Sequence, residues 1–320
     1  MRPSVAIVGA GAVGSWLADA LDCAGWAVSL LARGATLTAL RAHGLCVVKN
    51  GETRVSRPRS GTAAELGTHD FVLLAVKAHY LPQIAPTLRP LIGPSTIVVS
   101  GTNGIPWWFF HDFGGALANR SLQSVDPDRS QEMTFPRGRI LGSVVHASIE
   151  VLAPARVRVV AADRVLLGEP GGRVTQHLED LAQALRCGGI QAGLSHDIRL
   201  DVWLKLWGNM NMNPLSALTR CTTGRMLDDD DVRELCLRMM AEMQQCGELL
   251  GLRAGVSASE RMAVTRRLGD FRTSMLADLE AGLPLELAPQ LGAVAEIAQS
   301  LGVPAVFMRS ILGLTRLLSP

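Results

Sequence analysis

The hexapeptide GAGAVG, at residues 9–14, constrains the fold more than any other part of this sequence. It follows a short apolar run, Ser4–Val8, that is typical of a buried parallel strand, and a helical repeat of apolar residues begins at Val13. A second apolar run, residues 27–31, follows at the distance that a βαβ unit requires. A glycine turn alone also arises for structural reasons, but this context on both sides predicts a dinucleotide-binding unit.

The glycines of this turn have distinct places in such a unit. Gly9 makes the tight turn, Gly11 lets the backbone approach a pyrophosphate, and Gly14 lets the helix pack closely on the strand. The pyrophosphate then lies at the helix N-terminus, where free N–H groups point at it. The cofactor-binding residues predicted for the turn are Gly9, Ala10, Gly11, Ala12, Val13 and Gly14.

The residue that follows the second strand bears on the choice of cofactor. Units that bind NAD carry an acidic residue in this region, which holds the ribose 2′-hydroxyl. This chain has Arg33 instead, in the stretch LLARG, and a guanidinium suits a 2′-phosphate. The sequence therefore predicts NADP (as NADPH), and the alternative is an arginine that is simply solvated at the strand end.

Strands and helices continue to alternate through the first part of the chain. The expected elements are strands at 71–76, 96–100, 141–149, 157–160 and 165–167, a helix at 174–186 and a strand near Ile190. This pattern predicts an α/β fold with an N-terminal Rossmann-type doubly wound sheet over residues 1–195. Lys77 and Asn103 each follow an expected strand, at the edge where open α/β sheets build their sites, so we expect both beside the cofactor.

An aromatic cluster, residues 107–110, begins directly beyond Asn103 in a chain with only 4% aromatic residues. It lies in a less regular segment, residues 105–137, whose role the sequence does not determine. One interpretation is a loop anchored on the domain by its own aromatic side chains. The other is a pocket wall or a contact within a homodimer.

From His196 onward, helical patterning replaces strand patterning and predicts an all-helical domain over residues 196–320. Apolar residues at three-to-four spacing over 232–250 predict a long helix whose methionine stripe is core. Four aspartates, residues 228–231, precede this helix. We expect them to cap its free N–H groups rather than to bind a metal.

The stretch VWLKLWGNMNMNP, residues 202–214, combines an apolar helix face with a polar one. At about 100° per residue, the residues expected on the buried face are Trp203, Leu206, Trp207 and Met210. Lys205 falls on the far side, followed by Asn209 and Asn213, and Pro214 is expected to bend or end the helix. An exposed surface explains this polar ladder without any function. Asparagine is a poor helix former, however, and three of them before a proline favour a site.

The composition narrows the classes of partner. Thirty-one basic residues against 29 acidic ones give a net charge of +2, with no dense basic stripe for nucleic acid, so a small-molecule partner is expected. No apolar stretch approaches the roughly 20 residues that cross a bilayer. There is no signal peptide pattern, and a cytoplasmic location is expected. The six cysteines form no CxxC pairs and are expected to be reduced.

Five stretches of the chain resemble ketopantoate reductases (2-dehydropantoate 2-reductases) in their order and approximate spacing. They are VAIVGAGAVGSWLADAL, LLAVKA, NG at Asn103, VWLKLWGNMNMNPLSAL and SMLADLEAGLPLEL. The resemblance spans nearly the full chain, and the helix with lysine and asparagines is its most specific element. It implies an NADP-binding Rossmann domain joined to an all-helical domain. It also implies that ketopantoate is reduced to pantoate in the cleft between them, a step of pantothenate and coenzyme A biosynthesis.

The resemblance also implies roles for individual side chains. Lys205 is implied as the proton donor, with Glu286 holding the lysine or the substrate hydroxyl. The implied substrate ligands are Asn103, Asn209, Asn213 and Ser274, and those implied on the cofactor side are Lys77, Asn103 and Glu286. A lysine suits this role if partial desolvation lowers its pKa from about 10.4.

Some positions depart from the family pattern. Thr223 stands where the family has a third asparagine, and Ala288 followed by Pro289 replaces an acidic position, so the local helix start must be capped differently. The long aromatic segment is compatible with a bulkier 2-oxo acid.

Two further functions compete with a 2-oxo acid reductase. One is a catalytically idle NADPH-binding regulator, which would need only the first domain. The second is a dehydrogenase of a 3-hydroxy acid or of a polyol phosphate. A phosphate substrate would need more cations near Lys205 than the sequence offers.

Overall fold

The computed structural model describes residues 2–318, and the chain divides into two compact units. The first unit runs to Thr102 and resumes over Arg129–Ile198, whereas the second contains Asn103–Asp128 and the chain from Arg199 onward. The sequence predicts two consecutive domains, 1–195 and 196–320. The division found here differs by three residues at that boundary and, more substantially, by the grouping of Asn103–Asp128 with the helices.

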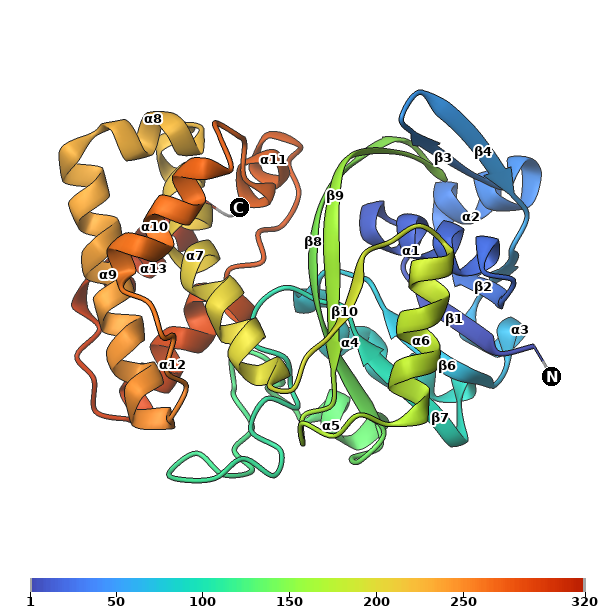
Figure 1. The fold of residues 1–320 in the computed structure, drawn as a ribbon, viewed down its shortest axis with the longest axis horizontal. Coiled ribbons are helices and arrows are strands. Elements are labelled where there is room, and N and C mark those ends of the chain that lie inside the picture. Colours follow the sequence, from blue (N-terminus) through green and yellow to red (C-terminus); the bar gives the residue numbers. More distant parts are fainter. Residues whose placement is uncertain (1, 319–320) are drawn as a thin grey trace. The chain divides into compact units, whose positions relative to one another are not determined.

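The first unit is built on a mixed sheet that has ten strands within the described residues (Figure 1). The strands are β1 (Ser4–Val8), β2 (Ala27–Leu31), β3 (Leu45–Lys49), β4 (Glu52–Ser56), β5 (Arg59–Gly61), β6 (His69–Leu74), β7 (Ile92–Ser100), β8 (Ile140–Ala153), β9 (Arg156–Gly168) and β10 (Ala192–Leu194). Their order is β4-β3-β9-β8-β7-β6-β1-β2-β5, with β10 paired to β9. The central strands β7, β6, β1 and β2 are parallel, which confirms the Rossmann-type α/β fold expected from the glycine turn.

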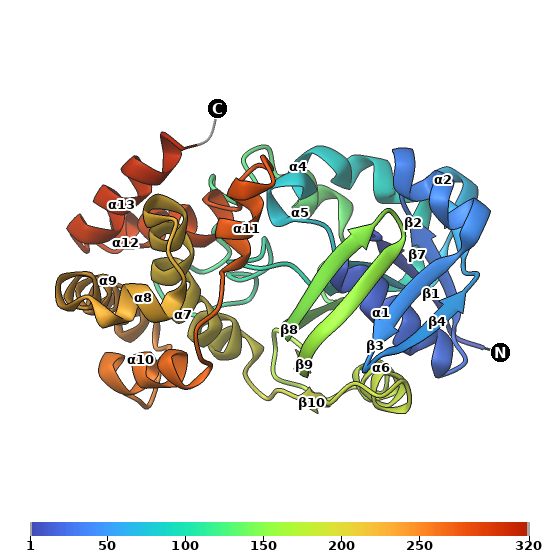
Figure 2. The same cartoon turned by 90° about the horizontal axis from the view of Figure 1, so that it is seen from above.

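Helices cover both faces of this sheet. They are α1 (Ala12–Cys23), α2 (Gly34–His43), α3 (Ala63–Leu66), η1 (Ala78–Tyr80), α4 (Leu81–Ile84), η2 (Ala85–Leu91), α5 (Ser130–Thr134) and α6 (Gln176–Cys187). Helices α4 and α5 lie on the opposite side of the sheet from α6, which packs against α1 (Figure 2). Burial on both faces explains why β1 reads as a continuous apolar run, with Val5–Val8 inaccessible to solvent.

The strands expected over 157–160 and 165–167 are wrong as separate elements, because both are parts of the single strand β9. It pairs antiparallel with β8 in a long hairpin whose register shifts at several points. The intervening residues, Ala161–Arg164, have low intrinsic β propensity, which is why the pattern suggested a break. Pairing with β8 outweighs that preference.

The second unit is helical in the described part of the chain. Its helices are α7 (Ile198–Thr219), α8 (Thr223–Asp228), α9 (Asp230–Leu250), α10 (Ala258–Arg267), α11 (Ser274–Glu280), the π-helix η3 (Ala288–Gly292), α12 (Ala293–Ser300) and α13 (Val306–Arg316). Helix α9 confirms the expected long helix with a buried methionine stripe. The Asp229 carboxylate caps it by accepting hydrogen bonds from the backbone N–H groups of Asp231 and Val232, as predicted for the aspartate run.

Helix α7 carries the stretch with lysine and asparagines, and its predicted apolar face is confirmed. The buried side chains of that face are Trp203, Leu206, Trp207 and Met210. The helix does not end at Pro214, however, and continues to Thr219. Proline removes the hydrogen bond to the carbonyl four residues earlier, and its ring crowds that carbonyl. Burial of the residues around it, Met212 to Ala217, stabilises the helix on both sides.

The aromatic cluster, residues 107–110, packs inside the second unit, where all four side chains are buried. The Phe109 ring lies 6.3 Å from the Trp203 ring between centroids. Arg199, at the start of α7, donates from Nε to the Phe109 carbonyl at 2.8 Å and also to the His111 carbonyl. These contacts explain why Asn103–Asp128 groups with the helices, and they favour the anchored-loop interpretation of the cluster.

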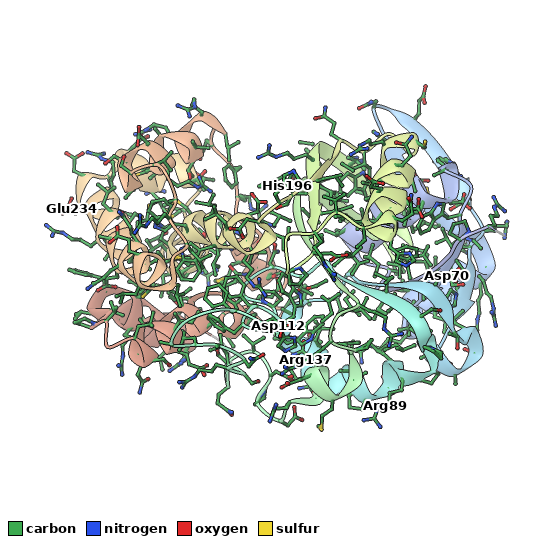
Figure 3. All side chains as sticks on the ribbon, turned by 60° about the horizontal axis from the view of Figure 1, so that its bottom comes forward. Asp70, Arg89, Asp112, Arg137, His196 and Glu234 are labelled. Carbon is green, nitrogen blue, oxygen red and sulfur yellow. The ribbon has the colours of Figure 1, made fainter. Side chains whose placement is uncertain are left out.

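Charged side chains of both signs project from the surfaces of the two units. Asp70 and Arg89 of the first unit and Glu234 of the second are examples (Figure 3). Of the helices in residues 2–318, none combines the length and the apolarity needed to span a bilayer.

Candidate active site

The glycine turn of the first unit leaves an open approach to the N-terminus of α1. A Cβ atom at Gly14 would overlap the Gly9 carbonyl oxygen, so this glycine lets α1 pack closely on the turn. A Cβ atom at Gly11 would meet nothing within 4 Å, so open space lies in front of the backbone there. Gly11 also occupies the N-cap of α1, where it supplies no side-chain cap. The turn therefore fits a pyrophosphate held by the free N–H groups of a helix.

Arg33 lies at the N-cap of α2, two residues after the end of β2, with its side chain exposed. Among residues 2–318, no side chain forms a hydrogen bond or ion pair with its guanidinium. A pocket of about 600 Å³ adjoins it on α2, lined by Gly34, Leu37, Thr38, Arg41 and Ala42. Two positive features, the guanidinium and the N-terminus of a ten-residue helix, thus coincide beyond the end of β2.

Lys77 belongs to the same unit and lies three residues beyond the end of β6. It occupies the N-cap of the short helix η1 and is partly buried. Its place after a central parallel strand is the one that the sequence predicts. Asn103, which the sequence predicts to lie beside the cofactor as well, belongs to the second unit.

Lys205 and Asn103 meet directly within the second unit, although 102 positions separate them in the sequence. The Lys205 ammonium donates from Nζ to Asn103 Oδ1 at 2.7 Å. Asn103 stands in the irregular segment that follows β7, and Lys205 projects from α7 on the side away from Trp203 and Trp207. The asparagine oxygen therefore fixes the direction of the amine without adding a charge.

Desolvation lowers the pKa of Lys205 to about 8, and the nearby carboxylate of Glu286 opposes this shift. Glu286 is itself buried, with 7% of its surface exposed. It lies in the irregular segment just before η3. The structure thus brings together an amine with a lowered pKa, an amide oxygen and a carboxylate.

The asparagines that follow Lys205 on α7 have different surroundings. Asn213 is buried and donates from Nδ2 to Oε1 of Gln290 at 2.8 Å. Asn209, one turn closer to Lys205, is partly buried, and within the described residues its side-chain amide forms no hydrogen bond. Asn209 therefore retains its full hydrogen-bonding capacity for a ligand.

Ser274 is the first residue of α11 and is exposed. The residue before it, Thr273, caps α11 by accepting from the Leu276 N–H at 3.2 Å. The Thr273 hydroxyl also forms a hydrogen bond with Ser216, which donates to the Asn213 carbonyl at 2.8 Å. This chain of hydroxyls ties the start of α11, and with it Ser274, to the Asn213 turn of α7.

Sequence reasoning missed the role of η3, which supports two of the predicted ligands. Ile105 donates its N–H to the Pro289 carbonyl at 2.8 Å, and a Cβ atom at Gly104 would overlap that same carbonyl. The Asn103 turn is therefore seated on η3. Gln290 belongs to no recognised motif, and only its placement in three dimensions shows that it contacts Asn213.

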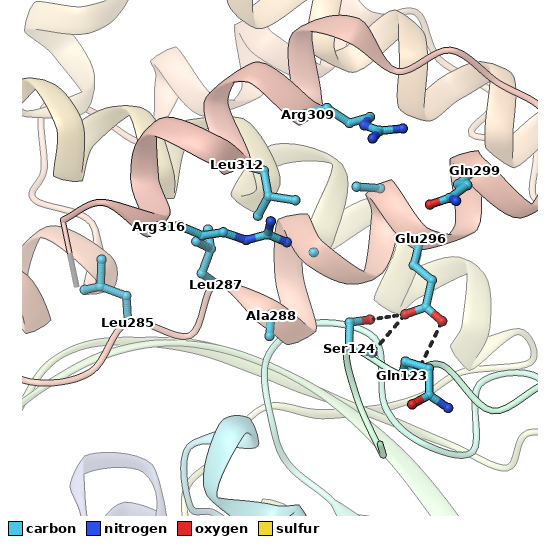
Figure 4. A pocket seen from close by; sticks show the side chains of 12 residues that line it. Gln123, Ser124, Leu285, Leu287, Ala288, Glu296, Gln299, Arg309, Leu312 and Arg316 are labelled. Atoms are coloured by element: carbon cyan, nitrogen blue, oxygen red, sulfur yellow. Dashed lines mark hydrogen bonds between the residues drawn. The ribbon is translucent and has the colours of Figure 1, made fainter. Parts of the chain in front are cut away.

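A second feature near this segment is a pocket of about 720 Å³ beside η3, α12 and α13. The Glu296 carboxylate closes one side by accepting from the N–H groups of Gln123 and Ser124, each at 2.8 Å, and from the Ser124 hydroxyl (Figure 4). These bonds anchor Gln123 and Ser124, near the end of the stretch Asn103–Asp128, to α12. The other walls include Leu285, Leu287, Arg309, Leu312 and Arg316.

Thr223, the residue that departs from the family pattern, is buried and has a structural contact. Its hydroxyl donates to the carbonyls of Gly269 and Phe271, at 3.3 and 3.2 Å. The side chain therefore holds the loop before α11. The family pattern has an asparagine at this position, and Thr223 supports the loop instead.

Family models match most of the chain. One described as "Ketopantoate reductase PanE/ApbA" matches residues 5–172. Another, described as "Ketopantoate reductase PanE/ApbA C terminal", matches residues 197–319. The chain belongs to the ketopantoate reductase family. As a member of this family it is an oxidoreductase, and the family resemblance of the five sequence stretches is confirmed.

Individual relatives and solved structures match this chain over nearly their full length. A 2-dehydropantoate 2-reductase from Mesorhizobium japonicum is 40% identical over 317 residues, which cover 98% of this chain and 97% of that protein. A crystal structure from Ralstonia solanacearum MolK2 has 43% sequence identity and a TM-score of 0.95, covering 99% of this chain and 98% of the other. D-mandelate dehydrogenase, solved with NADH and anilino(oxo)acetate, has a TM-score of 0.85 at 20% identity, with 99% and 98% coverage, and so shares the fold.

Proposed function

We propose that this chain reduces a 2-oxo acid with NADPH and that its substrate is 2-dehydropantoate (ketopantoate), which yields pantoate for pantothenate and coenzyme A biosynthesis. The single observation that carries the proposal is the environment of Lys205. A desolvated, partly buried amine with a pKa of about 8, held by Asn103 and close enough to Glu286 to feel its charge, has the properties of a general acid near neutral pH. Relatives named 2-dehydropantoate 2-reductase support the choice of substrate.

The residues of the second unit account for the proton in this reaction. Bound NADPH supplies the hydride that attacks the ketone carbon. Lys205 stabilises the negative charge that develops on the ketone oxygen and then donates its proton to that oxygen. Asn103 holds the amine in one direction. Glu286 favours the protonated amine, because its carboxylate raises the lysine pKa against the effect of desolvation.

Substrate recognition is assigned to neutral side chains of the same unit. Asn209, Asn213 and Ser274 offer amide and hydroxyl groups, which can bind the carboxylate and hydroxyl of a 2-oxo acid without adding charge. The free amide of Asn209 and the exposed hydroxyl of Ser274 support this assignment. We include Asn103 among the ligands because its amide N–H groups remain after Oδ1 has accepted from Lys205.

The residues of the first unit support the assignment of NADPH over NADH. The pyrophosphate is assigned to the turn of Gly9–Gly14 and the 2′-phosphate to Arg33. Lys77, and Glu286 of the second unit, are also assigned to the cofactor. The guanidinium of Arg33 is not paired within the described residues. Arg33 occupies the N-cap position of α2, a helix whose first turn holds no acidic residue. Both features favour a dianionic phosphate over a hydroxyl.

A bulkier 2-oxo acid is the alternative substrate, which the length of the aromatic segment suggests. The four rings of residues 107–110 are buried against their own unit, which does not favour a role in enlarging a pocket. An idle regulator is also disfavoured, because a sensor has no need of a desolvated lysine paired with Asn103.

The test is a spectrophotometric panel that follows NADPH and NADH oxidation with 2-dehydropantoate, 3-methyl-2-oxobutanoate and phenylglyoxylate. We expect 2-dehydropantoate with NADPH to give the highest kcat/KM. Lys205→Met, which matches the lysine stem in size, should lower kcat by about 10²-fold or more while NADPH binding, measured by fluorescence, stays intact. The proposal fails if no 2-oxo acid is reduced. A higher kcat/KM for phenylglyoxylate would change the assigned substrate but not the assigned type of reaction.

A further inference from the structure

Gln290 is a buried polar side chain that the reaction described above does not use. It lies in the π-helix η3 and has 1% of its surface exposed. Its Oε1 accepts a hydrogen bond of 2.8 Å from Nδ2 of Asn213, which has 5% of its surface exposed. The two amides approach from segments 77 positions apart in the sequence.

The contact limits what Asn213 can offer to a ligand. A free asparagine amide has two N–H donors and one carbonyl acceptor, and it can rotate about its last bond. With one N–H committed to Gln290, one N–H and the carbonyl remain, in a fixed orientation. Losing the acceptor at position 290 would leave a buried N–H unpaired, and the Asn213 amide would turn to find another partner.

The local helix geometry shows how Gln290 reaches this position. Segments of π-helix are rare and occur mostly as single wide turns, frequently at functional sites. In η3 the same wide turn also directs the Pro289 carbonyl to the Ile105 N–H, and the helix begins two residues after Glu286. One short element therefore contacts both the Asn103 turn and Asn213.

We propose that Gln290 is a positioning residue for the substrate, because its amide oxygen holds the Asn213 amide in the orientation that binds the 2-oxo acid. This inference rests on the proposed function, in which Asn213 is a substrate ligand. Gln290 itself touches neither substrate nor cofactor. It acts through Asn213 alone.

The competing explanation is purely structural: Gln290 fills space and holds η3 against α7. The two explanations differ in a double-mutant cycle. If Gln290 acts through Asn213, its replacement has no further effect once the Asn213 amide is gone. If it only supports packing, its effect persists in that background.

The experiment measures KM and kcat for 2-dehydropantoate, and the Kd for NADPH, in four proteins: wild type, Gln290→Met, Asn213→Ala and the double variant. Methionine keeps the length of glutamine but accepts no strong hydrogen bond. We expect Gln290→Met to raise KM about tenfold, as loss of one hydrogen bond to a ligand-binding group predicts, with NADPH Kd unchanged. The double variant should match Asn213→Ala within about twofold. Gln299→Met, the same substitution at an exposed position on the neighbouring α12, is the control and should leave KM unchanged.

The outcomes separate this proposal from the proposed function. A wild-type protein that reduces no 2-oxo acid would refute both. If the wild type turns over normally but the effects of Gln290→Met and Asn213→Ala on KM multiply in the double variant, only the positioning role is refuted. An unchanged KM in Gln290→Met would refute it as well. If Gln290→Met does not fold, Gln290→Asn serves the same cycle, because it keeps the amide but withdraws the oxygen from Asn213 by one methylene.

Discussion

The lowered pKa of Lys205 makes the pH dependence of turnover a direct test of its role as proton donor. Only the protonated amine can deliver a proton, so kcat/KM should fall as the pH rises through the lysine pKa. Desolvation places that pKa at about 8 rather than at the usual value of 10.5. The fall in kcat/KM should therefore occur within a pH range that most enzymes tolerate.

The size of the effect follows from the two pKa values. With a pKa of about 8, the protonated fraction drops from about nine-tenths at pH 7 to about one-tenth at pH 9, and kcat/KM falls about tenfold. With a pKa of 10.5, the same change of pH would remove only about 3% of the protonated form. The two cases are easily distinguished.

The assay records initial rates of NADPH oxidation from pH 6.5 to 9.5 at constant ionic strength. In Lys205→Met the remaining rate should not depend on pH over this range. Glu286→Gln removes the carboxylate that raises the lysine pKa, so its fall should begin at lower pH than in the wild type. A wild-type profile that stays flat to pH 9.5 would show that Lys205 is not the titrating acid. An upward displacement of the midpoint in Glu286→Gln would contradict the electrostatic argument.

Further predictions concern the first unit. Arg33→Ser should weaken NADPH binding by about tenfold or more, the scale of a charge-assisted phosphate contact, and should leave NADH binding unchanged. Fluorescence titrations with the two cofactors measure both affinities. Equal losses of affinity would contradict the assignment of Arg33 to the 2′-phosphate. Gly14→Ala should destabilise the fold by about 1–3 kcal/mol or more through overpacking against Gly9, which a thermal melt detects as a lower Tm. Gly11→Ala should keep its Tm, since its Cβ meets nothing within 4 Å, but should lose dinucleotide affinity. A Gly11→Ala variant that binds NADPH normally would argue against a pyrophosphate at this turn.

Local patterns in the sequence are sufficient where the deciding interactions are local. The glycine turn between β1 and α1 and the Asp229 cap of α9 depend on residues within a few positions of each other. The buried face of α7 follows from helical periodicity alone. These features could be predicted from residue type and spacing.

Features that depend on distant partners could not be predicted in the same way. The hydrogen bond from Lys205 to Asn103 joins residues 102 positions apart, and only the family resemblance placed both in one site. Gln290 was missed because a lone glutamine within a short helical turn has no distinguishing pattern. Pro214 was expected to bend or end α7, and it does not end it, since tertiary packing outweighs the loss of one helical hydrogen bond.

The return of the chain through Asn103–Asp128 has a consequence for recombination between relatives. A hybrid joined at residue 195 would take Asn103 from one parent and Lys205 from the other, although the two side chains share a hydrogen bond. The same crossover would separate Phe109 from Trp203 and from Arg199, and Pro289 from Ile105. Exchange of the first unit between family members therefore preserves these contacts only if residues 103–128 are inherited together with the helices that follow residue 198.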